Sequence, residues 1–108
     1  MTVPEIDIVA LEAALAEGSP LIDVREPAEF VEVRVPSAKL IPLGTVTERV
    51  AEIPAAGTVY IICRSGARSA RAAEFLRTQG IDAVNVAGGT MAWVESGRPL
   101  DTGAGSTS

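Results

Sequence analysis

Short runs of aliphatic and β-branched residues alternate along the chain with segments rich in Ala, Leu and Glu. Such runs, when bounded by Gly, Pro or charged residues, are typical of buried strands. The clearest is Thr58–Ile62, which is apolar on both faces as an interior strand of a parallel sheet should be. Shorter runs predict three further strands, at Leu21–Val24, Ala38–Ile41 and Ala83–Val86.

The segments between these strands have helical spacing. Ile8, Leu11 and Leu15 share one helical face after Asp7, a residue type that suits an N-cap, and Gly18 ends the segment. Further helices are predicted after Pro27, through Val46–Val50, from about Ser69 to Gln79, and around Met91–Val94.

The alternation of strands and helices predicts an α/β fold, with a central, mainly parallel sheet of about five short strands and helices on both faces. In such folds, ligands bind at the carboxyl ends of the strands. The length of 108 residues suits a single domain, which we place at residues 1–100. The Gly, Ser and Thr composition of residues 101–108 predicts a flexible C-terminal tail.

Composition removes most catalytic apparatus from consideration. The chain has no histidine and one cysteine, Cys63. Without histidine there is no Ser/His/Asp or Cys/His pair, and one cysteine makes neither a thiolate-rich zinc site nor an internal disulfide. We therefore expect no metal and no cofactor, and any enzymatic chemistry has to work without imidazole.

Charge excludes further classes of function. The net charge is −5, the basic residues form no run, and Lys39 is the only lysine among nine basic residues. We therefore expect no nucleic-acid partner and no membrane partner. No segment has the roughly 18 apolar residues of a membrane span, and the first residues carry acids where a signal peptide needs bases, which predicts a cytoplasmic protein.

Cys63 directly follows the clearest predicted strand and precedes a predicted helix. A lone cysteine is often a small buried hydrophobe, but the neighbours of this one are small or cationic, with Arg64 and Arg68 on either side of Gly66. Backbone N–H groups in such a loop, together with the positive end of the helix, form an anion-binding nest. The same field favours a thiolate over a thiol, which supplies a nucleophile without a base.

The run Cys63-Arg64-Ser65-Gly66-Ala67-Arg68-Ser69 resembles the active-site loop of the rhodanese-like domains, specifically the small single-domain sulfurtransferases. Two more segments resemble signatures of that family, Asp23–Phe30 (Asp-Val-Arg-Glu-Pro-Ala-Glu-Phe) and Gly88–Trp93 (Gly-Gly-Thr-Met-Ala-Trp). Three signatures in order, over residues 3–100, make the resemblance specific. It implies a rhodanese-like α/β fold.

The resemblance also implies a function. Cys63 would take a sulfane sulfur from thiosulfate or a similar anionic donor, form a persulfide, and pass the sulfur to a thiophilic acceptor such as cyanide, a thiol or a sulfur-accepting protein. Arg64 and Arg68 would bind the donor and stabilise the leaving sulfite, and the loop amides of Ser65, Gly66 and Ala67 would cradle the persulfide. The chain departs from the family at Val33–Ala38, where Val-Arg-Val-Pro-Ser-Ala replaces the common Gly-His-Ile-Pro-Gly-Ala, which bears on the local turn and on substrate access.

Two alternatives stay open. A cysteine phosphatase also sets Cys and Arg around an anion loop, but with five residues between them, whereas four separate Cys63 from Arg68. A loop one residue shorter is too tight for phosphate and suits a single sulfur atom. The other alternative is a binding module, either non-catalytic or a sulfur relay. The presence of the cysteine counts against a non-catalytic module. A relay and an enzyme need the same cysteine loop, so the sequence does not separate these two.

The remaining polar and aromatic residues favour structural interpretations. Asp23 and Arg25 are expected to form an ion pair at the exit of a strand, Trp93 to lie in the core, and Gly88 and Gly89 to serve a turn. The spacing of Glu26, Glu29 and Glu32 predicts a solvated helix face rather than a pair of catalytic carboxylates. Surface ion pairing is expected of Arg49, Arg71, Arg77 and Arg98.

Overall fold

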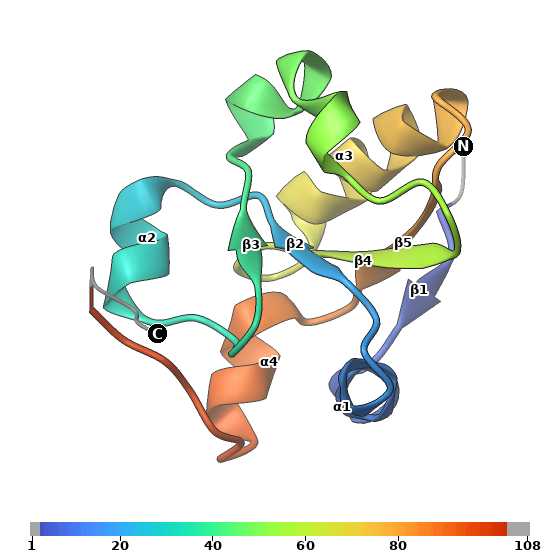
Figure 1. The fold of residues 1–108 in the computed structure, drawn as a ribbon. Helices are drawn as coiled ribbons and strands as arrows, with labels where there is room; N and C mark the ends of the chain where they lie inside the picture. The colour runs from blue at the N-terminus through green and yellow to red at the C-terminus, as the bar shows by residue number, and fades with distance from the viewer. Residues whose placement is uncertain (1–2, 104–108) are drawn as a thin grey trace.

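A single parallel sheet forms the middle layer of the computed structural model, which describes residues 3–103 (Figure 1). All strand pairs are parallel, and the strand order is β1-β5-β4-β2-β3. The five strands are β1 (Glu5–Ile6), β2 (Leu21–Asp23), β3 (Lys39–Leu40), β4 (Thr58–Ile62) and β5 (Asp82–Val86). The predicted α/β class with a parallel sheet is confirmed.

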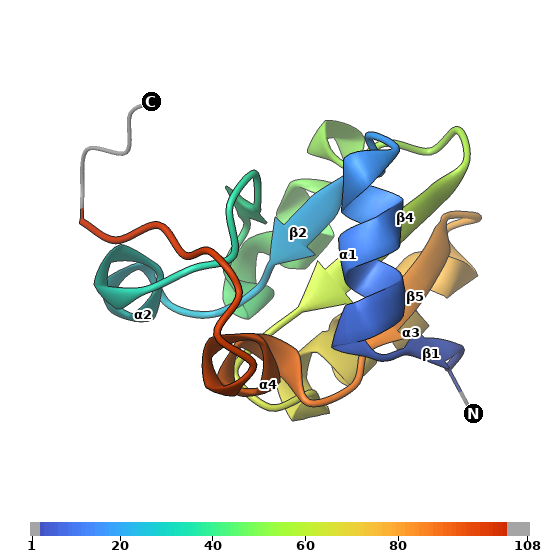
Figure 2. The same cartoon turned by 90° about the horizontal axis from the view of Figure 1, so that it is seen from below.

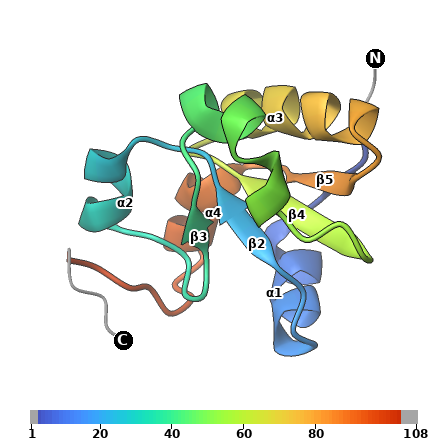
Figure 3. The ribbon, with the colours of Figure 1, turned by 45° about the horizontal axis from the view of Figure 1, so that its top comes forward.

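Helices cover both faces of the sheet. The 12-residue helix α3 and two 3-10 helices lie over one face, and α1 and α4 lie over the other (Figures 1 and 3). The view from below places α2 beside α4, beyond the edge of the sheet (Figure 2). The helices are α1 (Ile8–Ala16), α2 (Pro27–Glu32), η1 (Leu43–Glu48), η2 (Val50–Glu52), α3 (Ala67–Thr78) and α4 (Gly89–Glu95). Within residues 3–103, no helix is long and apolar enough to cross a membrane.

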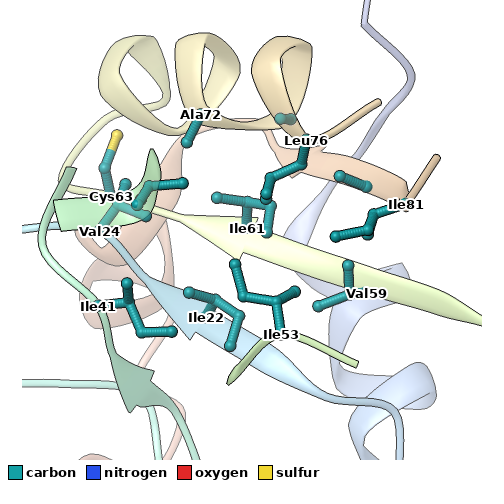
Figure 4. Close-up of a cluster of buried hydrophobic side chains, with 13 residues drawn as sticks. Ile22, Val24, Ile41, Ile53, Val59, Ile61, Cys63, Ala72, Leu76 and Ile81 are labelled. Atoms are coloured by element: carbon teal, nitrogen blue, oxygen red, sulfur yellow. The ribbon is translucent and has the colours of Figure 1, made fainter. Parts of the chain in front are cut away.

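The core is divided by the sheet into two clusters of buried side chains. Alternate residues of β4 serve the two clusters, because successive side chains in a strand point to opposite faces. Val59 and Ile61 pack with Leu76 of α3 (Figure 4), while Ile62 packs with Leu11 of α1 and Trp93 of α4 on the other face. Both faces of the central strand are therefore buried, and Trp93 is a core residue as expected.

The predicted bounds of the strands and helices agree best with the structure where the apolar pattern in the sequence is strongest. Thr58–Ile62 is a strand with the predicted bounds, and the first helix begins directly after Asp7, whose carboxylate accepts from the Ala10 N–H. The third α-helix begins at Ala67 rather than Ser69, because Gly66 takes the N-cap position with a φ of 115° that favours glycine. The two-residue edge strand β1 went unpredicted, since two residues carry no periodicity.

Residues 101–103, at the start of the expected C-terminal tail, contact the segment that follows α2. Arg34 and Asp101 form an antiparallel bridge with backbone hydrogen bonds of 2.9 and 3.0 Å. The Arg34 guanidinium also donates to the carbonyls of Phe30 and Gly103, each at 2.9 Å, and lies over the Phe30 ring. Arg34 is 4% exposed, and its contacts join the C-terminal segment to α2. Residues 104–108 of the expected tail lie outside the described residues.

The first turn of α4 is packed against the backbone that follows β4. The N–H groups of Thr90 and Met91 donate to the carbonyl oxygens of Cys63 and Arg64 at 2.8 and 3.0 Å. A Cβ atom at Gly89 would lie 2.6 Å from the Cys63 oxygen and 2.5 Å from the Arg64 oxygen, and the φ of Gly89 is 59°. The close approach therefore requires glycine at this position.

Replacing Gly89 by alanine should lower the free energy of unfolding by about 2 to 4 kcal/mol, because the added methyl group meets backbone atoms that cannot move aside. Gly97→Ala is the matched control: Gly97 also has a positive φ, of 79°, but its added Cβ would meet no atom within 4 Å. The control should cost only about 1 kcal/mol, from the left-handed conformation. Urea denaturation of both variants measures the difference, and equal losses would contradict the close contact.

Candidate active site

Cys63 lies at the carboxyl end of β4, one turn before α3 begins. Its side chain is 1% exposed, and Figure 4 shows the sulfur directed toward the first turn of α3. Gly66 accommodates the sharp turn between the strand and the helix. The fold therefore places the single thiol of the chain at the edge of the sheet where α/β proteins bind ligands.

Two donors contact the sulfur directly. The Gly66 N–H donates to Sγ at 3.1 Å, and the Ser69 hydroxyl lies 3.2 Å from it. Burial is the largest influence and raises the pKa of the Cys63 thiol, but hydrogen bonds from the Ser69 side chain and from the backbone of Ser69, Gly66 and Ser65 together bring that pKa below its usual value. These hydrogen bonds stabilise the thiolate without the help of a histidine.

The orientation of the loop explains why its amides face the sulfur. The carbonyl oxygens of Cys63 and Arg64 are taken up by the N–H groups at the start of α4. The Ser65 N–H belongs to the same peptide group as the Arg64 carbonyl, so holding that oxygen on the α4 side turns the Ser65 N–H away from α4. The Gly66 N–H, in the next peptide group, donates to Sγ. Ala67, also expected to line the site, is exposed in the first turn of α3, and the hydrogen bonds to the sulfur within residues 3–103 come from Gly66 and Ser69.

Arg68 is held by a carboxylate from another element. Its two terminal nitrogens donate to Oε1 and Oε2 of Glu29 at 2.8 and 2.9 Å, a bidentate ion pair between α3 and α2. Glu29 Oε1 also accepts from the Glu26 N–H at 2.9 Å. The hydrogen bonds from Arg68 lower the pKa of Glu29 to about 2.

The expectation that Glu29 belongs to a solvated face was therefore wrong. Its spacing from Glu26 and Glu32 is that of a surface helix, but its partner is 39 residues away in sequence, on α3. The available signal was that Glu29 and Arg68, which have opposite charges, belong to two different segments that resemble family signatures.

Arg64 points into a different environment. It is exposed, and its Nε lies 3.2 Å from the Met91 sulfur. Within residues 3–103 it forms no ion pair. It lines a pocket of about 450 Å³ between α2 and α4, which also includes Glu29 and Thr90. Of the two arginines predicted to bind a donor, Arg68 has a carboxylate partner and Arg64 has none within the described residues.

A buried ion pair fixes α2, which carries Glu29, beside the loop. Asp23 is fully buried and Arg25 is 3% exposed, and a guanidinium nitrogen of Arg25 lies 2.8 Å from Asp23 Oδ2. The same nitrogen donates to the Val33 carbonyl at 2.7 Å, and another lies 3.4 Å from the Glu29 carbonyl. The predicted ion pair at the exit of β2 is confirmed, and it also binds α2 at its C-terminal end.

One residue near the sulfur was not predicted from the sequence. Asn85, on β5, is 1% exposed, and its Oδ1 lies 2.5 Å from the Ser69 hydroxyl. Its side-chain nitrogen donates to Glu5 on β1 and to the Gly66 carbonyl. A single asparagine inside an apolar strand is the signal that could have identified it, since buried polar groups need partners.

The site thus consists of a thiol at a strand end, an amide-lined loop and two arginines, and comparison with known proteins supplies the family. A model of the rhodanese-like domain family matches residues 8–96. The chain belongs to the rhodanese-like domain family.

Individual relatives span nearly the whole chain. A sulfurtransferase of Allochromatium vinosum is 41% identical over 101 residues, covering 91% of this chain and 94% of the relative. The putative sulfurtransferase YtwF of Bacillus subtilis is 38% identical, covering 92% and 98% of the two chains. The solved structure of a rhodanese-related protein from Thermoplasma volcanium has a TM-score of 0.85 at 31% identity, covering 91% of this chain and 97% of that one. The family is thus a rhodanese-like sulfurtransferase family, and its fold is the one described here.

The Glu29–Arg68 pair makes a pH-dependent contribution to stability. Because the pKa of Glu29 falls from its ordinary 4.5 to about 2 on folding, the pair stabilises the fold above pH 4.5 and loses this contribution as pH falls toward 2. Glu29→Gln should therefore lower the free energy of unfolding by about 1 kcal/mol at pH 7, a value reduced by partial exposure of the pair. The difference from the unmodified protein should shrink on acidification.

Urea denaturation at pH 7 and at pH 3 measures this change. Glu32→Gln is the matched control, because Glu32 is exposed on the same helix and forms no ion pair within residues 3–103. Its stability should differ little from that of the unmodified protein at either pH. A Glu29→Gln effect that stays constant between the two pH values would mean that the ion pair is not its source.

Proposed function

We propose that the protein is a rhodanese-type sulfurtransferase that moves a sulfane sulfur from thiosulfate, or a similar anionic donor, to cyanide or a thiol through a Cys63 persulfide. The observation that carries this proposal is the environment of Sγ: a buried sulfur that accepts from the Gly66 N–H at 3.1 Å and lies 3.2 Å from the Ser69 hydroxyl, at the N-terminus of a 12-residue helix. Such a site stabilises negative charge on sulfur in both the thiolate and the persulfide.

The reaction consists of two displacements at sulfur. The Cys63 thiolate attacks the outer sulfur of thiosulfate, a new S–S bond forms, and the S–S bond of the donor breaks with its electron pair leaving on sulfite. Cyanide or a thiolate then attacks the terminal sulfur of the persulfide, and the Cys63 thiolate leaves. Neither step needs a proton, which fits a chain without histidine.

The two arginines have different roles in this proposal. Arg64, whose charge is uncommitted, binds the sulfonate end of the donor at the pocket between α2 and α4. Arg68, held by Glu29 on both oxygens, supplies a fixed positive charge beside the loop. Burial of the sulfur requires that the donor present its narrow end, a single sulfur atom, to the loop.

A relay role uses the same site. The putative sulfur carrier protein YrkF of Bacillus subtilis is 37% identical over 95 residues, and the matched region is 51% of its length. In a relay, the acceptor would be a thiol on a partner protein and the persulfide step would be unchanged. The phosphatase alternative is disfavoured because only four residues separate Cys63 from Arg68 and the amides converge on a single atom, the sulfur.

Cys63→Ser should abolish transfer of sulfur from thiosulfate to cyanide, because a serine hydroxyl at this site remains protonated and cannot carry the sulfur. Thiocyanate formation measures the activity. In addition, incubation of the unmodified protein with thiosulfate should add the mass of one sulfur atom to the peptide that contains Cys63, and cyanide should remove it. Residual turnover in the variant, or an unmodified peptide, would contradict the proposal.

Arg64→Ala should raise the KM for thiosulfate about tenfold, with a smaller effect on kcat, because a charge-assisted contact to the donor is lost. Arg71→Ala is the matched control, since Arg71 is an exposed arginine of α3 outside the pocket. Steady-state kinetics with thiosulfate and mercaptopyruvate, and with an aryl phosphate to test the phosphatase alternative, measure both variants. Equal effects of the two substitutions would remove the assigned role of Arg64.

A further inference from the structure

The Ser69 hydroxyl is placed among three acceptors. It lies 3.2 Å from the Cys63 sulfur, 2.5 Å from Asn85 Oδ1 and 3.3 Å from the Gly66 carbonyl oxygen, and Ser69 is fully buried. A hydroxyl has one proton to donate and can also accept. Its proton therefore serves one of these acceptors at a time, and the shortest contact is to Asn85.

The orientation of the Asn85 amide is determined by its other neighbours. Its nitrogen lies 2.7 Å from Glu5 Oε2 and 3.2 Å from the Gly66 carbonyl oxygen. Both are acceptors, so the NH₂ group has to face them and Oδ1 has to face Ser69. The contact to Glu5 follows from the sheet, because Glu5 and Asn85 are register partners on β1 and β5.

We propose that Asn85 is a positioning residue for the Cys63 sulfur: it holds the Ser69 proton while Cys63 is a thiol, and Ser69 transfers its hydrogen bond to the sulfur when the thiolate or persulfide forms. In the thiol state, S–H donates to Ser69, Ser69 to Asn85 and Asn85 to Glu5, so each of these side chains has a hydrogen-bond partner. In the thiolate state, the charge on sulfur attracts the hydroxyl proton, and Asn85 Oδ1 loses its donor.

Asn85 therefore competes with the sulfur for one proton. Removing the Asn85 acceptor should free the hydroxyl to donate to the sulfur permanently, and the thiol should ionise at lower pH. Removing the hydroxyl should have the opposite effect. If Asn85 merely filled space, its removal would not shift the pH at which the Cys63 thiol ionises in a way that depends on Ser69.

The other charged groups around the sulfur remain constant in this comparison. They are Arg64 in the loop, Arg68 of α3 with its partner Glu29 of α2, and the buried Asp23–Arg25 pair at the end of β2. The contribution of α4 is backbone N–H groups, which bind the loop carbonyls. Glu5, reached through Asn85, is the charge contributed by β1.

The test measures the pH dependence of Cys63 alkylation by iodoacetamide in the unmodified protein, Asn85→Leu, Ser69→Ala and the double variant. Asn85→Leu should shift the midpoint down by about half a pH unit, which gives about threefold more thiolate below the midpoint. Ser69→Ala should shift it up, and Asn85→Leu should add nothing in that background. An upward shift in Asn85→Leu, or the same shift with and without Ser69, would overturn the proposal.

A second variant avoids substitution of a buried residue. In Glu5→Lys, an exposed side chain that accepts from the Asn85 amide becomes a donor. This favours the amide orientation with its oxygen outward and its NH₂ toward Ser69, against the single remaining acceptor, the Gly66 carbonyl, and in that orientation the hydroxyl is free to donate to the sulfur. Glu17→Lys, an exposed acid at the end of α1, makes the same change in net charge and controls for long-range electrostatics. Glu5→Lys should lower the midpoint more than the control does, and the excess should vanish in the Ser69→Ala background; equal shifts would overturn the role of Glu5.

The inference rests on the proposed role of Cys63 as the nucleophile, but the measurement follows ionisation of the thiol and not sulfur transfer. If the protein transfers no sulfur and the Asn85 shift is observed, the proposed function fails and the positioning role stands. If transfer occurs and the shift is absent, the positioning role fails alone.

Discussion

Two backbone hydrogen bonds, from Thr90 and Met91 to the carbonyl oxygens of Cys63 and Arg64, determine how the loop after β4 is presented. A peptide group has its C=O and N–H on opposite sides, so holding the oxygens of Cys63 and Arg64 toward α4 turns the N–H groups of Arg64 and Ser65 away from α4. The close approach is possible only because residue 89 is glycine, since a Cβ atom at this position would collide with those oxygens. The segment Gly88–Trp93 thus acts on the cysteine loop through its backbone.

Electrostatics at the site is local and opposed to the charge of the whole molecule. The net charge is −5, so an anion approaching at long range is repelled. Near the loop, both terminal nitrogens of Arg68 donate to Glu29, so within residues 3–103 Arg64 is the loop arginine without a carboxylate partner. Positive potential at the sulfur therefore comes mainly from fixed amide dipoles and the start of α3, which the solvent screens poorly because the thiol is buried.

Local patterns in the sequence predicted the parts of the structure that depend on local chemistry. Thr58–Ile62, the N-cap at Asp7 and the Asp23–Arg25 pair involve residues close in sequence, and periodicity or proximity indicates each of them. The Glu29–Arg68 pair and the Asn85–Ser69 contact join segments 39 and 16 residues apart, so they depend on the order and register of the strands. The resemblance to a family identified the cysteine loop, but it indicated neither of these partners.

In the proposed reaction, no imidazole is present to deprotonate the thiol when the donor binds, so we expect the thiolate to form before the donor arrives. Burial raises the pKa of the Cys63 thiol, and hydrogen bonds from Ser69, Gly66 and Ser65 have to outweigh that effect. Amides and hydroxyls can do this because they stabilise the thiolate and the persulfide alike, whereas an imidazole would also offer a proton that displacement at sulfur does not require. The absence of histidine therefore fits the proposed reaction, in which the sulfur stays anionic throughout the cycle.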